Sequence, residues 1–411
     1  MNFKRSVKNL ISGFNRVVFL KKRKNLDLRN VKSVLIISLY FRGDFLFHTP
    51  FIKLLAAILP DARIDIWTKS RNLELTHNNP DIDDVLMFDD IKTAGYNDNA
   101  KFNLGGKINF LKKLRKTKYD LVIDLTGHIS TAIFTYLSKS GYTIGINNFG
   151  FGAAYNKFID LNPASTRGHL IDKYLRVLKE SFGINDEKWK TLLSANGTKP
   201  VLYPSRQDAD TVRKILDELS INRDEPLVLL HTTAGWSAKE WDPLNYSRLI
   251  EMLNDKHYQF IFIGDDRDRK NFELILDNSG LKDVPKFKKH FLKLKFLEVA
   301  ELINQADILV GSDSAPLHIA GAMNTPSVGI FGPTNPDFSN PVGEMHKVVY
   351  HKLHCSAADN MQYCTRNAGM TCPTIDCMKM VKPEEVMQLI EGLINEFRES
   401  KKNKSTSGSL Q

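Results

Sequence analysis

A strand–helix–strand pattern between Ile308 and Pro336 is the feature that most constrains the fold of this chain. An apolar strand (Ile308–Val310) runs into a polar turn, a helix of small residues (Ile319–Met323) follows, and a second apolar strand (Ser327–Phe331) ends in Gly-Pro-Thr. Strands and helices that alternate in this way form parallel α/β sheets, and ligands bind at the carboxyl ends of their strands. The stretch therefore predicts an α/β sheet that holds a phosphorylated ligand at two successive strand ends.

The turn before this helix has the composition of an anion site. Asp313 and Ser314 are both good N-cap residues, and Pro316 stands where a first-turn proline is tolerated. Backbone N–H groups at a helix N-terminus lack partners within the helix, and with the positive end of the helix dipole they attract phosphate. The expected donors are the N–H groups of Ala315, Leu317 and His318.

The length and charge of the chain set broad limits. A chain of 411 residues has room for two α/β domains. A net charge of +10 suits phosphorylated ligands, anionic lipids and nucleic acid alike. No apolar run approaches the roughly 20 residues that span a bilayer. The early run Val17–Leu20 is followed by the basic Lys21–Lys24 and not by a signal-peptide cleavage site, which predicts a cytoplasmic protein.

Residues 1–30 predict a basic amphipathic helix. Apolar residues from Phe3 to Val18 recur at helical spacing, cations flank them, and no acidic residue precedes Asp27. This composition is typical of a helix that lies on an anionic membrane surface. Docking of the apolar face on the chain's own domain is the alternative. We expect the protein to be peripheral, on the inner face of the membrane.

Short apolar strands alternate with helices along residues 31–200, which predicts a doubly wound parallel sheet. A second domain is expected at residues 201–395, after a proline-bounded linker, and a polar tail at 396–411, disordered from Lys401 onward. The expected strands are Val31–Leu39, Arg63–Trp67, Val85–Phe88, Tyr119–Leu125, Tyr142–Ile146, Leu227–His231 and Gln259–Ile263, and the expected helices of the first domain are Thr49–Leu59, Lys107–Lys116 and Ile129–Leu137.

These motifs resemble glycosyltransferase family 9, the heptosyltransferases of lipopolysaccharide core synthesis. DSAPLHIAGA followed by GIFGPTNP is similar to the family's C-terminal signature, although Ala315 replaces the usual Gly and Gly321 interrupts an alanine run. RGDFLFHTP (Arg42–Pro50) resembles the N-terminal signature, and Tyr119–Ile146 resembles the block that follows. The resemblance covers roughly residues 31–390. It implies two Rossmann-like domains facing across a cleft (the GT-B architecture), with the acceptor on the N-terminal domain and the nucleotide sugar on the C-terminal one.

The resemblance also implies a reaction: inverting transfer of a heptose from a nucleotide-diphosphate donor, ADP-heptose, to a phosphorylated lipid A–core acceptor, without cofactor or metal. Its partners would be the nucleotide sugar, the lipid or oligosaccharide acceptor and an anionic membrane, and not nucleic acid. A same-family transferase that uses a UDP-sugar, a nucleotide-sugar epimerase of the same architecture and a catalytically inactive membrane-surface adaptor remain as alternatives.

Asp44 is the expected general base, because inverting transfer needs a carboxylate that takes the proton of the acceptor hydroxyl. Asp44 is expected just beyond the carboxyl end of the first strand, where such sheets carry their reactive groups. A helix cap or a solvated loop residue is the alternative for a Gly-Asp pair. Arg42 and His128 are the expected acceptor-binding residues.

The loop after Leu227–His231 supplies the expected diphosphate contacts. Thr232 and Thr233 can donate to phosphate oxygens, and Lys239 can neutralise the leaving diphosphate, unless it is merely a solvated surface residue. Family members carry a lysine followed by tryptophan here, as Lys239 and Trp241 do.

The turn after Gly264 should place an acidic residue against the ribose hydroxyls. Aligning on Gly264 favours Asp268, with Asp265, Asp266 or a simple exposed turn as alternatives. Asp266 and Asp268 also have the spacing of metal-dependent transferases, which the resemblance outweighs. In the earlier turn, Asp313 is expected to position the loop or a donor hydroxyl, and His318 to contact phosphate or to pack.

All four cysteines lie in one C-terminal segment, at Cys355, Cys364, Cys372 and Cys377. Their spacing is not that of a zinc ribbon or finger. Reduced thiols, a structural metal site and disulfides all remain open.

Overall fold

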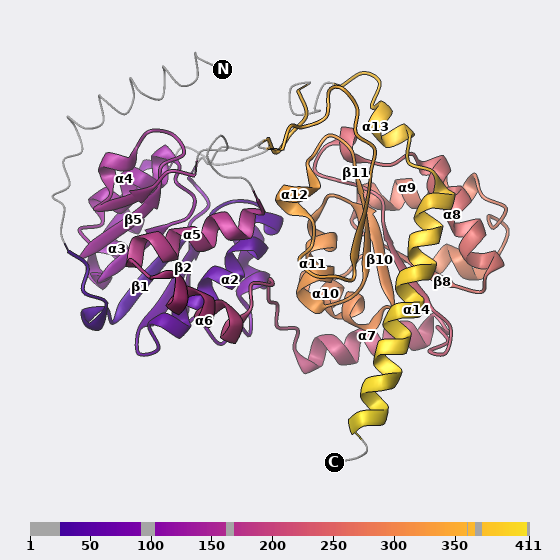
Figure 1. The fold of residues 1–411 in the computed structure, drawn as a ribbon, viewed down its shortest axis with the longest axis horizontal. Coiled ribbons are helices and arrows are strands. Elements are labelled where there is room, and N and C mark those ends of the chain that lie inside the picture. Colours follow the sequence, from indigo (N-terminus) through magenta and orange to yellow (C-terminus); the bar gives the residue numbers. More distant parts are fainter. Residues whose placement is uncertain (1–24, 92–102, 162–167, 360, 366–371, 409–411) are drawn as a thin grey trace. The chain divides into compact units, whose positions relative to one another are not determined.

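The computed structural model describes residues 25–91, 103–161, 168–359, 361–365 and 372–408, and describes side chains as far as residue 400. The predicted amphipathic helix therefore lies largely outside the described residues. Two compact units make up the chain, Met1–Thr166 with Leu170–Thr198, and Lys199–Gln411 with Arg167–His169 (Figure 1). No helix among the described residues is long and apolar enough to cross a lipid bilayer.

The N-terminal unit is built on one parallel sheet of six strands in the order β3-β2-β1-β4-β5-β6. The order reverses between β1 and β4, which makes their carboxyl ends the switch point where α/β sheets bind ligands. The strands are β1 (Ser33–Ile37), β2 (Arg63–Thr68), β3 (Asp84–Met87), β4 (Leu121–Asp124), β5 (Tyr142–Ile146) and β6 (Lys157–Ile159); the helices are α2 (Arg42–Ile58), α3 (Leu104–Thr117), α4 (Ile129–Leu137), α5 (Leu170–Phe182) and α6 (Asp186–Asn196).

The C-terminal unit repeats this plan with the strand order β12-β11-β10-β7-β8-β9, again parallel throughout. Its switch point lies between β7 and β10. The strands are β7 (Leu227–His231), β8 (Gln259–Ile263), β9 (Phe291–Leu292), β10 (Ile308–Ser312), β11 (Ser327–Phe331) and β12 (His346–Tyr350); the helices are α7 (Arg206–Glu218), α8 (Pro243–Asp255), α9 (Asp266–Asp277), α10 (Phe296–Gln305), α11 (Ala315–Met323), α12 (Pro336–Ser339), α13 (Asp376–Lys379) and α14 (Pro383–Gly408).

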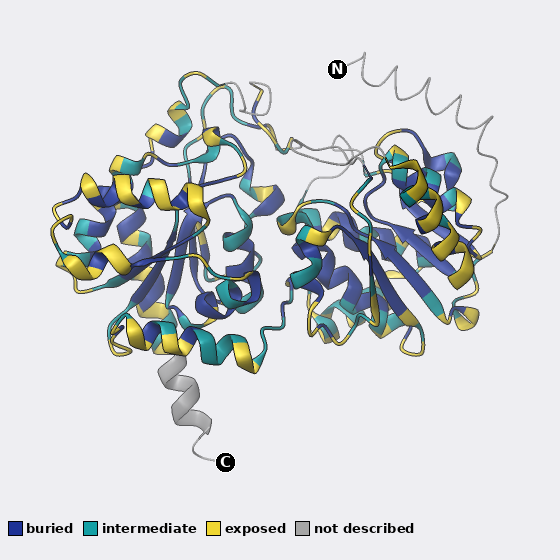
Figure 2. Cartoon of the chain, turned by 180° about the vertical axis from the view of Figure 1, so that it is seen from behind, coloured by how far each residue is buried: buried dark blue, intermediate teal, exposed yellow. Residues whose placement is uncertain are grey.

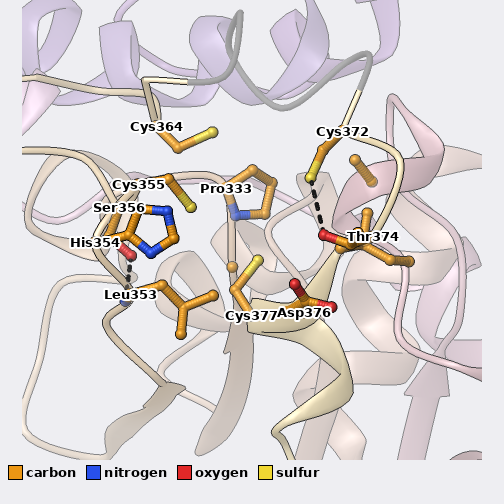
Figure 3. Close-up of a pocket in the computed structure, with 13 residues that line it drawn as sticks. Pro333, Leu353, His354, Cys355, Ser356, Cys364, Cys372, Thr374, Asp376 and Cys377 are labelled. Carbon is orange, nitrogen blue, oxygen red and sulfur yellow. Dashed lines mark hydrogen bonds between the residues drawn. The ribbon is translucent and has the colours of Figure 1, made fainter.

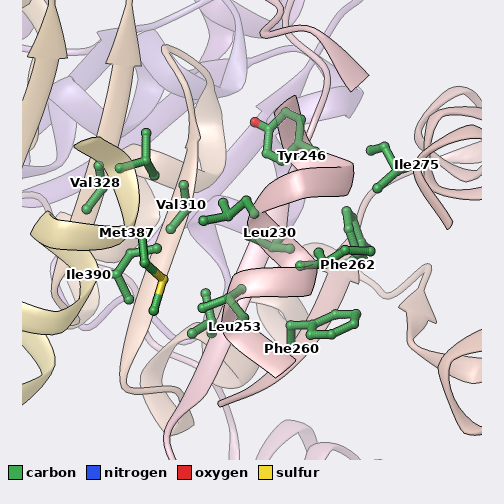
Figure 4. Packing of buried hydrophobic residues seen from close by; sticks show 14 of the residues in the cluster. Leu230, Tyr246, Leu253, Phe260, Phe262, Ile275, Val310, Val328, Met387 and Ile390 are labelled. Atoms are coloured by element: carbon green, nitrogen blue, oxygen red, sulfur yellow. The ribbon is translucent and has the colours of Figure 1, made fainter. Parts of the chain in front are cut away.

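Buried apolar strands form the centre of each unit, because helices cover both faces of a parallel sheet (Figure 2). In the C-terminal unit one large cluster joins the central strands to α8, α9 and α14. Figure 4 shows how Leu230 and Val310 from two neighbouring strands meet Tyr246 and Leu253 of α8 and Ile390 of α14. This packing fixes the strand ends from which the polar loops emerge.

The predicted fold class, two Rossmann-like α/β domains, is confirmed. The bounds of several elements differ from the prediction, among them those of the first helix and of the tail. The first helix begins at Arg42 and not at Thr49, so that Pro50 lies inside it. Proline has no N–H to donate to the carbonyl oxygen of Leu46, and the Thr49 hydroxyl donates to that oxygen instead, at 2.7 Å. The tail is the second difference: α14 continues to Gly408, so most of the segment expected to be disordered is helical.

Candidate functional site

In the C-terminal unit, the predicted donor-site residues gather in the loops that follow β7 and β10. Lys239 comes from the first loop and Asp313 from the second. The Lys239 Nζ lies 2.7 Å from Asp313 Oδ2 and donates a further bond of 3.1 Å to the Asp313 carbonyl oxygen. Only 15% of the Lys239 side chain and 7% of the Asp313 side chain are exposed. Lys239 is therefore not a solvated surface lysine.

The charge of Asp313 is held by its surroundings. Burial alone would raise the pKa of this carboxyl, but the charge of Lys239 and the hydrogen bond that it donates hold that pKa below its ordinary value. His318 Nε2 lies 3.7 Å from Asp313 Oδ1. Burial lowers the pKa of His318 to about 4, so its ring is neutral at neutral pH. The group at this position is thus a buried Lys–Asp pair with a neutral imidazole beside it.

Large neighbouring side chains fix the position of Lys239. Trp241, two residues on, is 1% exposed and donates its indole N–H to the carbonyl oxygen of Val381 at 3.1 Å. The Lys239 ammonium also lies 5.1 Å from the centre of the Trp236 ring. Packing therefore explains the Lys-x-Trp pattern. The buried tryptophan anchors the loop in the core and so fixes the position of the lysine two residues before it.

The start of α11 differs in detail from the prediction. Ser314 is the N-cap residue, but its hydroxyl caps no backbone N–H. Its Oγ lies 3.2 Å from His231 Nδ1 and donates to the Ser312 carbonyl oxygen at 3.1 Å. The Leu317 N–H, expected to be unpaired, donates to the Ser314 carbonyl oxygen at 3.2 Å in a tight first turn. Pro316 stands in that first turn, as expected.

Asp268 lies inside the first turn of α9 and not in an exposed turn. It is 3% exposed; its Oδ1 accepts a 2.6 Å bond from the Thr233 hydroxyl, and its Oδ2 accepts the Asp265 N–H at 2.9 Å. A ribose contact would have to compete with these bonds. Asp266 is mostly exposed and pairs with Lys293, so the two carboxylates of the Asp-x-Asp spacing have different surroundings. Thr232 and Thr233 are each 2% exposed.

The four cysteines line one small cavity of about 30 Å³, together with Ala238 of the Lys239 loop and with Gly332 and Pro333 after β11 (Figure 3). All four are free thiols, so the disulfide alternative does not hold in this structure. Burial raises the pKa of Cys377 to about 11, which keeps that thiol protonated. Within the described part of the chain, no three His, Cys, Asp or Glu side chains are placed to hold a metal ion.

In the N-terminal unit, Asp44 lies in the first turn of α2, where a negative charge faces the positive end of the helix dipole. Residues 38–41 connect β1 to α2, so Asp44 lies shortly after the carboxyl end of the first strand, in a helix and not in a loop. The Asp44 side chain is half-buried. Arg42 is exposed and donates from its Nε to the carbonyl oxygen of Arg71 at 2.9 Å.

A buried polar network that the sequence analysis missed holds the loop after β4. The Oδ1 of Asp124 accepts the N–H groups of Thr126 and Gly127 at 3.0 and 2.9 Å, and its Oδ2 accepts the Tyr155 hydroxyl at 2.7 Å. Tyr40 donates its hydroxyl to the Thr126 carbonyl oxygen at 2.6 Å. Burial raises the pKa of Tyr40, as do the nearby charges of Asp44 and Asp124. Tyr40 therefore links the Asp44 turn to this loop.

His128 ends the same loop as the N-cap residue of α4. Its Nδ1 accepts the Ser130 N–H at 3.3 Å, and its ring meets that of Phe149 edge-on with centroids 5.3 Å apart. The structure thus brings His128 close to the carboxyl ends of β4 and β5. In the sequence, the polar residues that directly follow the YDLVIDL strand were the available signal for this network.

Comparisons with known proteins agree with this architecture. The sequence model of glycosyltransferase family 9 (heptosyltransferase) matches residues 108–368. Lipopolysaccharide heptosyltransferase 3 of Escherichia coli is 28% identical over 304 residues, which cover 73% of this chain and 84% of that protein.

Two solved structures share the fold. The glycosyl transferase family 9 protein from Veillonella parvula DSM 2008 has a TM-score of 0.74 at 20% identity and covers 91% of this chain and all (100%) of that one. The ADP-heptose lps heptosyltransferase II of E. coli has a TM-score of 0.68 at 18% identity, with 89% and 99% covered.

Proposed function

Because the chain belongs to glycosyltransferase family 9, we propose that it transfers a heptose from ADP-heptose to a lipopolysaccharide core or lipid A acceptor. The buried Lys239–Asp313 pair beside the start of α11 is the single observation that carries the proposal. The relatives support the choice of substrates, since one is a lipopolysaccharide heptosyltransferase and another is described as an ADP-heptose enzyme.

The C-terminal unit binds the donor in this proposal. A departing nucleoside diphosphate gains negative charge, and a fixed cation together with a helix N-terminus stabilises that charge without reorganising. Lys239 supplies the cation, and α11 supplies the dipole and the N–H groups of its first turn. Thr232, Thr233, Ser314 and His318 complete the donor site, and a ribose contact from Asp268 remains a prediction. Lys239 and the α11 dipole supply the positive charge in this proposal, in which the transfer needs no metal ion.

The N-terminal unit binds the acceptor, with Asp44 as general base, Arg42 and His128 as acceptor contacts, and inversion at the anomeric carbon. The half-buried Asp44 carboxylate near the Tyr40 hydroxyl supports this assignment. A base that takes the proton of an attacking hydroxyl must be reachable yet shielded from bulk water. The Asp44 turn, joined through Tyr40 to the loop that ends at His128, has both properties.

We further propose that residues 1–30 hold the enzyme at an anionic membrane surface, on the cytoplasmic side where a lipid acceptor would be presented. Residues 1–24 contain eight Lys or Arg and no Asp or Glu, which is +8 of the net +10 and leaves +2 for the rest of the chain. Each cation near an anionic surface contributes about 1 kcal/mol. The positive charge is therefore concentrated where a membrane contact is proposed.

Calorimetric titration of the full-length protein with ADP, UDP, GDP and CDP, with EDTA present, tests the donor proposal. Selective ADP binding, followed by heptose transfer from ADP-heptose to a lipid A–core acceptor, is the expected result. Selective UDP binding would move the donor to another sugar. Binding of none would favour an inactive adaptor and would refute the donor site.

A further inference from the structure

A row of three buried or partly buried polar groups, Asp268, His231 and Ser314, leads to the start of α11. His231 is the last residue of β7, and its two ring nitrogens face different partners. Nδ1 lies 3.2 Å from Ser314 Oγ, and Nε2 lies 3.7 Å from Asp268 Oδ1. Only 12% of the His231 side chain and 4% of the Asp268 side chain are exposed. An imidazole thus lies between a buried carboxylate and the hydroxyl of the α11 N-cap.

The carboxylate of Asp268, at one end of this row of polar groups, has little freedom to rotate. Thr233 donates to Asp268 Oδ1 at 2.6 Å, and the Asp265 N–H donates to Oδ2 at 2.9 Å. Gly264 packs directly against it, since a Cβ on Gly264 would lie 2.2 Å from Asp268 Cγ. Asp268 is therefore held facing His231, which places a negative charge beside a ring that can gain a proton.

The other groups around the ring set its resting state. From the start of α9 come Asp265, Arg267 and Asp268; burial lowers the pKa of His231, Asp268 and Asp265 act against this, and Arg267 adds to it. From α8, the Tyr246 hydroxyl bonds to the His231 carbonyl oxygen and not to its ring. The imidazole is consequently neutral at neutral pH in this environment.

The protonation state of the ring decides where the Ser314 hydroxyl hydrogen can point. A neutral Nδ1 without hydrogen accepts the Ser314 O–H, whereas a protonated ring donates from Nδ1 to Ser314 Oγ. In the second case the hydroxyl hydrogen is released from the ring, and the oxygen of a bound anion competes for it with the Ser312 carbonyl oxygen, which lies 3.1 Å from Ser314 Oγ. An added anion nearby would favour this second state, because opposite charges within about 4–6 Å stabilise the charged form of a group.

We propose that His231 is a positioning residue of the donor site, which takes up one proton from solvent when a nucleoside diphosphate binds at the start of α11 and thereby turns the Ser314 hydroxyl toward the phosphate. This inference rests on the proposed donor site. Asp268 acts in it through His231, as the counter-charge that holds the imidazolium.

Calorimetry of ADP binding in two buffers of different ionisation enthalpy, near neutral pH, measures the proton uptake directly. The full-length protein and His231→Gln are compared. We expect the unsubstituted protein to take up more protons than the variant, and the variant to bind ADP about tenfold more weakly. Any change in the protonation of ADP itself contributes equally to the two proteins. The difference in proton uptake between them is therefore due to His231. Equal proton uptake would overturn the inference.

Two further variants sharpen the comparison. Asp268→Asn should also lose the extra uptake, because an amide does not stabilise an imidazolium. His257→Asn changes an exposed histidine at the amino end of β8 and should leave the uptake unchanged. If His231→Gln or Asp268→Asn prevents folding, NMR titration of the histidine rings in the unsubstituted protein tests the same point. A His231 ring that remains neutral when ADP saturates the protein would refute the inference. If ADP binds without this proton uptake, the inference about His231 is refuted and the proposed donor site stands. If ADP does not bind, both the inference and the donor site are refuted.

Discussion

Lys239 and Asp313 are 74 residues apart in the sequence, and their side chains form a buried ion pair with a 2.7 Å bond. The pair joins the loop after β7 to the loop after β10, at the switch point of the C-terminal sheet. The ammonium is thus held in place, and a diphosphate that binds there meets a cation that needs no reordering.

Substituting Lys239→Met should lower kcat/KM by about 100-fold or more, since a fixed positive charge near a leaving diphosphate contributes several kcal/mol to the transition state. Steady-state transfer assays measure the effect. Lys293→Met is the matched control: Lys293 forms an ion pair with Asp266 in the same unit, but both side chains are more than half exposed. Equal losses in the two variants would contradict the role of Lys239.

Asp313→Asn should destabilise the C-terminal unit by about 3 kcal/mol at neutral pH, because it leaves the buried Lys239 ammonium without its partner. The folded-state pKa of Asp313 is depressed below its ordinary 3.8, so its contribution is present above that value and is lost as the pH falls through the folded pKa. Urea unfolding of both proteins at a series of pH values should show the difference narrowing below about pH 4. If the difference in free energy of unfolding between the two proteins stays constant with pH, the ion pair is not the source of that difference.

Asp44→Asn should abolish transfer while ADP binding stays nearly unchanged, because the amide cannot accept a proton and Asp44 belongs to the acceptor side. Asp172→Asn is a matched control, since Asp172 is an exposed acidic residue in the first turn of α5 in the same unit. Turnover of the Asp44 variant close to that of the control would show that another group is the base.

Gly145→Ala should destabilise the N-terminal unit by about 2 kcal/mol, because its Cβ would lie 2.3 Å from the Tyr155 ring. The shift would also displace the Tyr155 hydroxyl from Asp124. Chemical denaturation checks the stability. Gly105→Ala, in α3, has nothing within 4 Å of its new Cβ and should cost nothing. If both variants unfold at the same denaturant concentration, Tyr155 does not constrain this strand.

Removing residues 1–24 should greatly weaken sedimentation with vesicles of anionic lipid, since the net charge falls from +10 to +2. Binding of ADP should persist, because the proposed donor site lies in the C-terminal unit. The full-length protein should also dissociate from the vesicles as salt is raised. Unchanged vesicle binding by the shortened protein would place the membrane contact elsewhere.

The sequence alone determined the two Rossmann-like units. Tyr142–Ile146, Leu227–His231 and Gln259–Ile263 were predicted as strands with the bounds that the structure has, because strands buried on both faces are continuous apolar runs between turns. The first helix was predicted to begin too late, at Thr49. Local reasoning takes Pro50 as a helix start, whereas the Thr49 hydroxyl bond to Leu46 lets the helix run through it.

Only the tertiary structure decided which side chains meet. Lys239, Asp313 and His231 follow or end strands that are distant in the sequence and adjacent in the sheet, and strand order is not encoded in any local pattern. Asp268 was predicted to contact ribose, with a simple exposed turn as the alternative; in the fold it is buried against Thr233 and close to His231, because the first turn of α9 directs its carboxylate inward. Composition and periodicity depend on neighbours along the chain and therefore predict the elements, whereas the polar networks depend on long-range packing and are defined only by the fold.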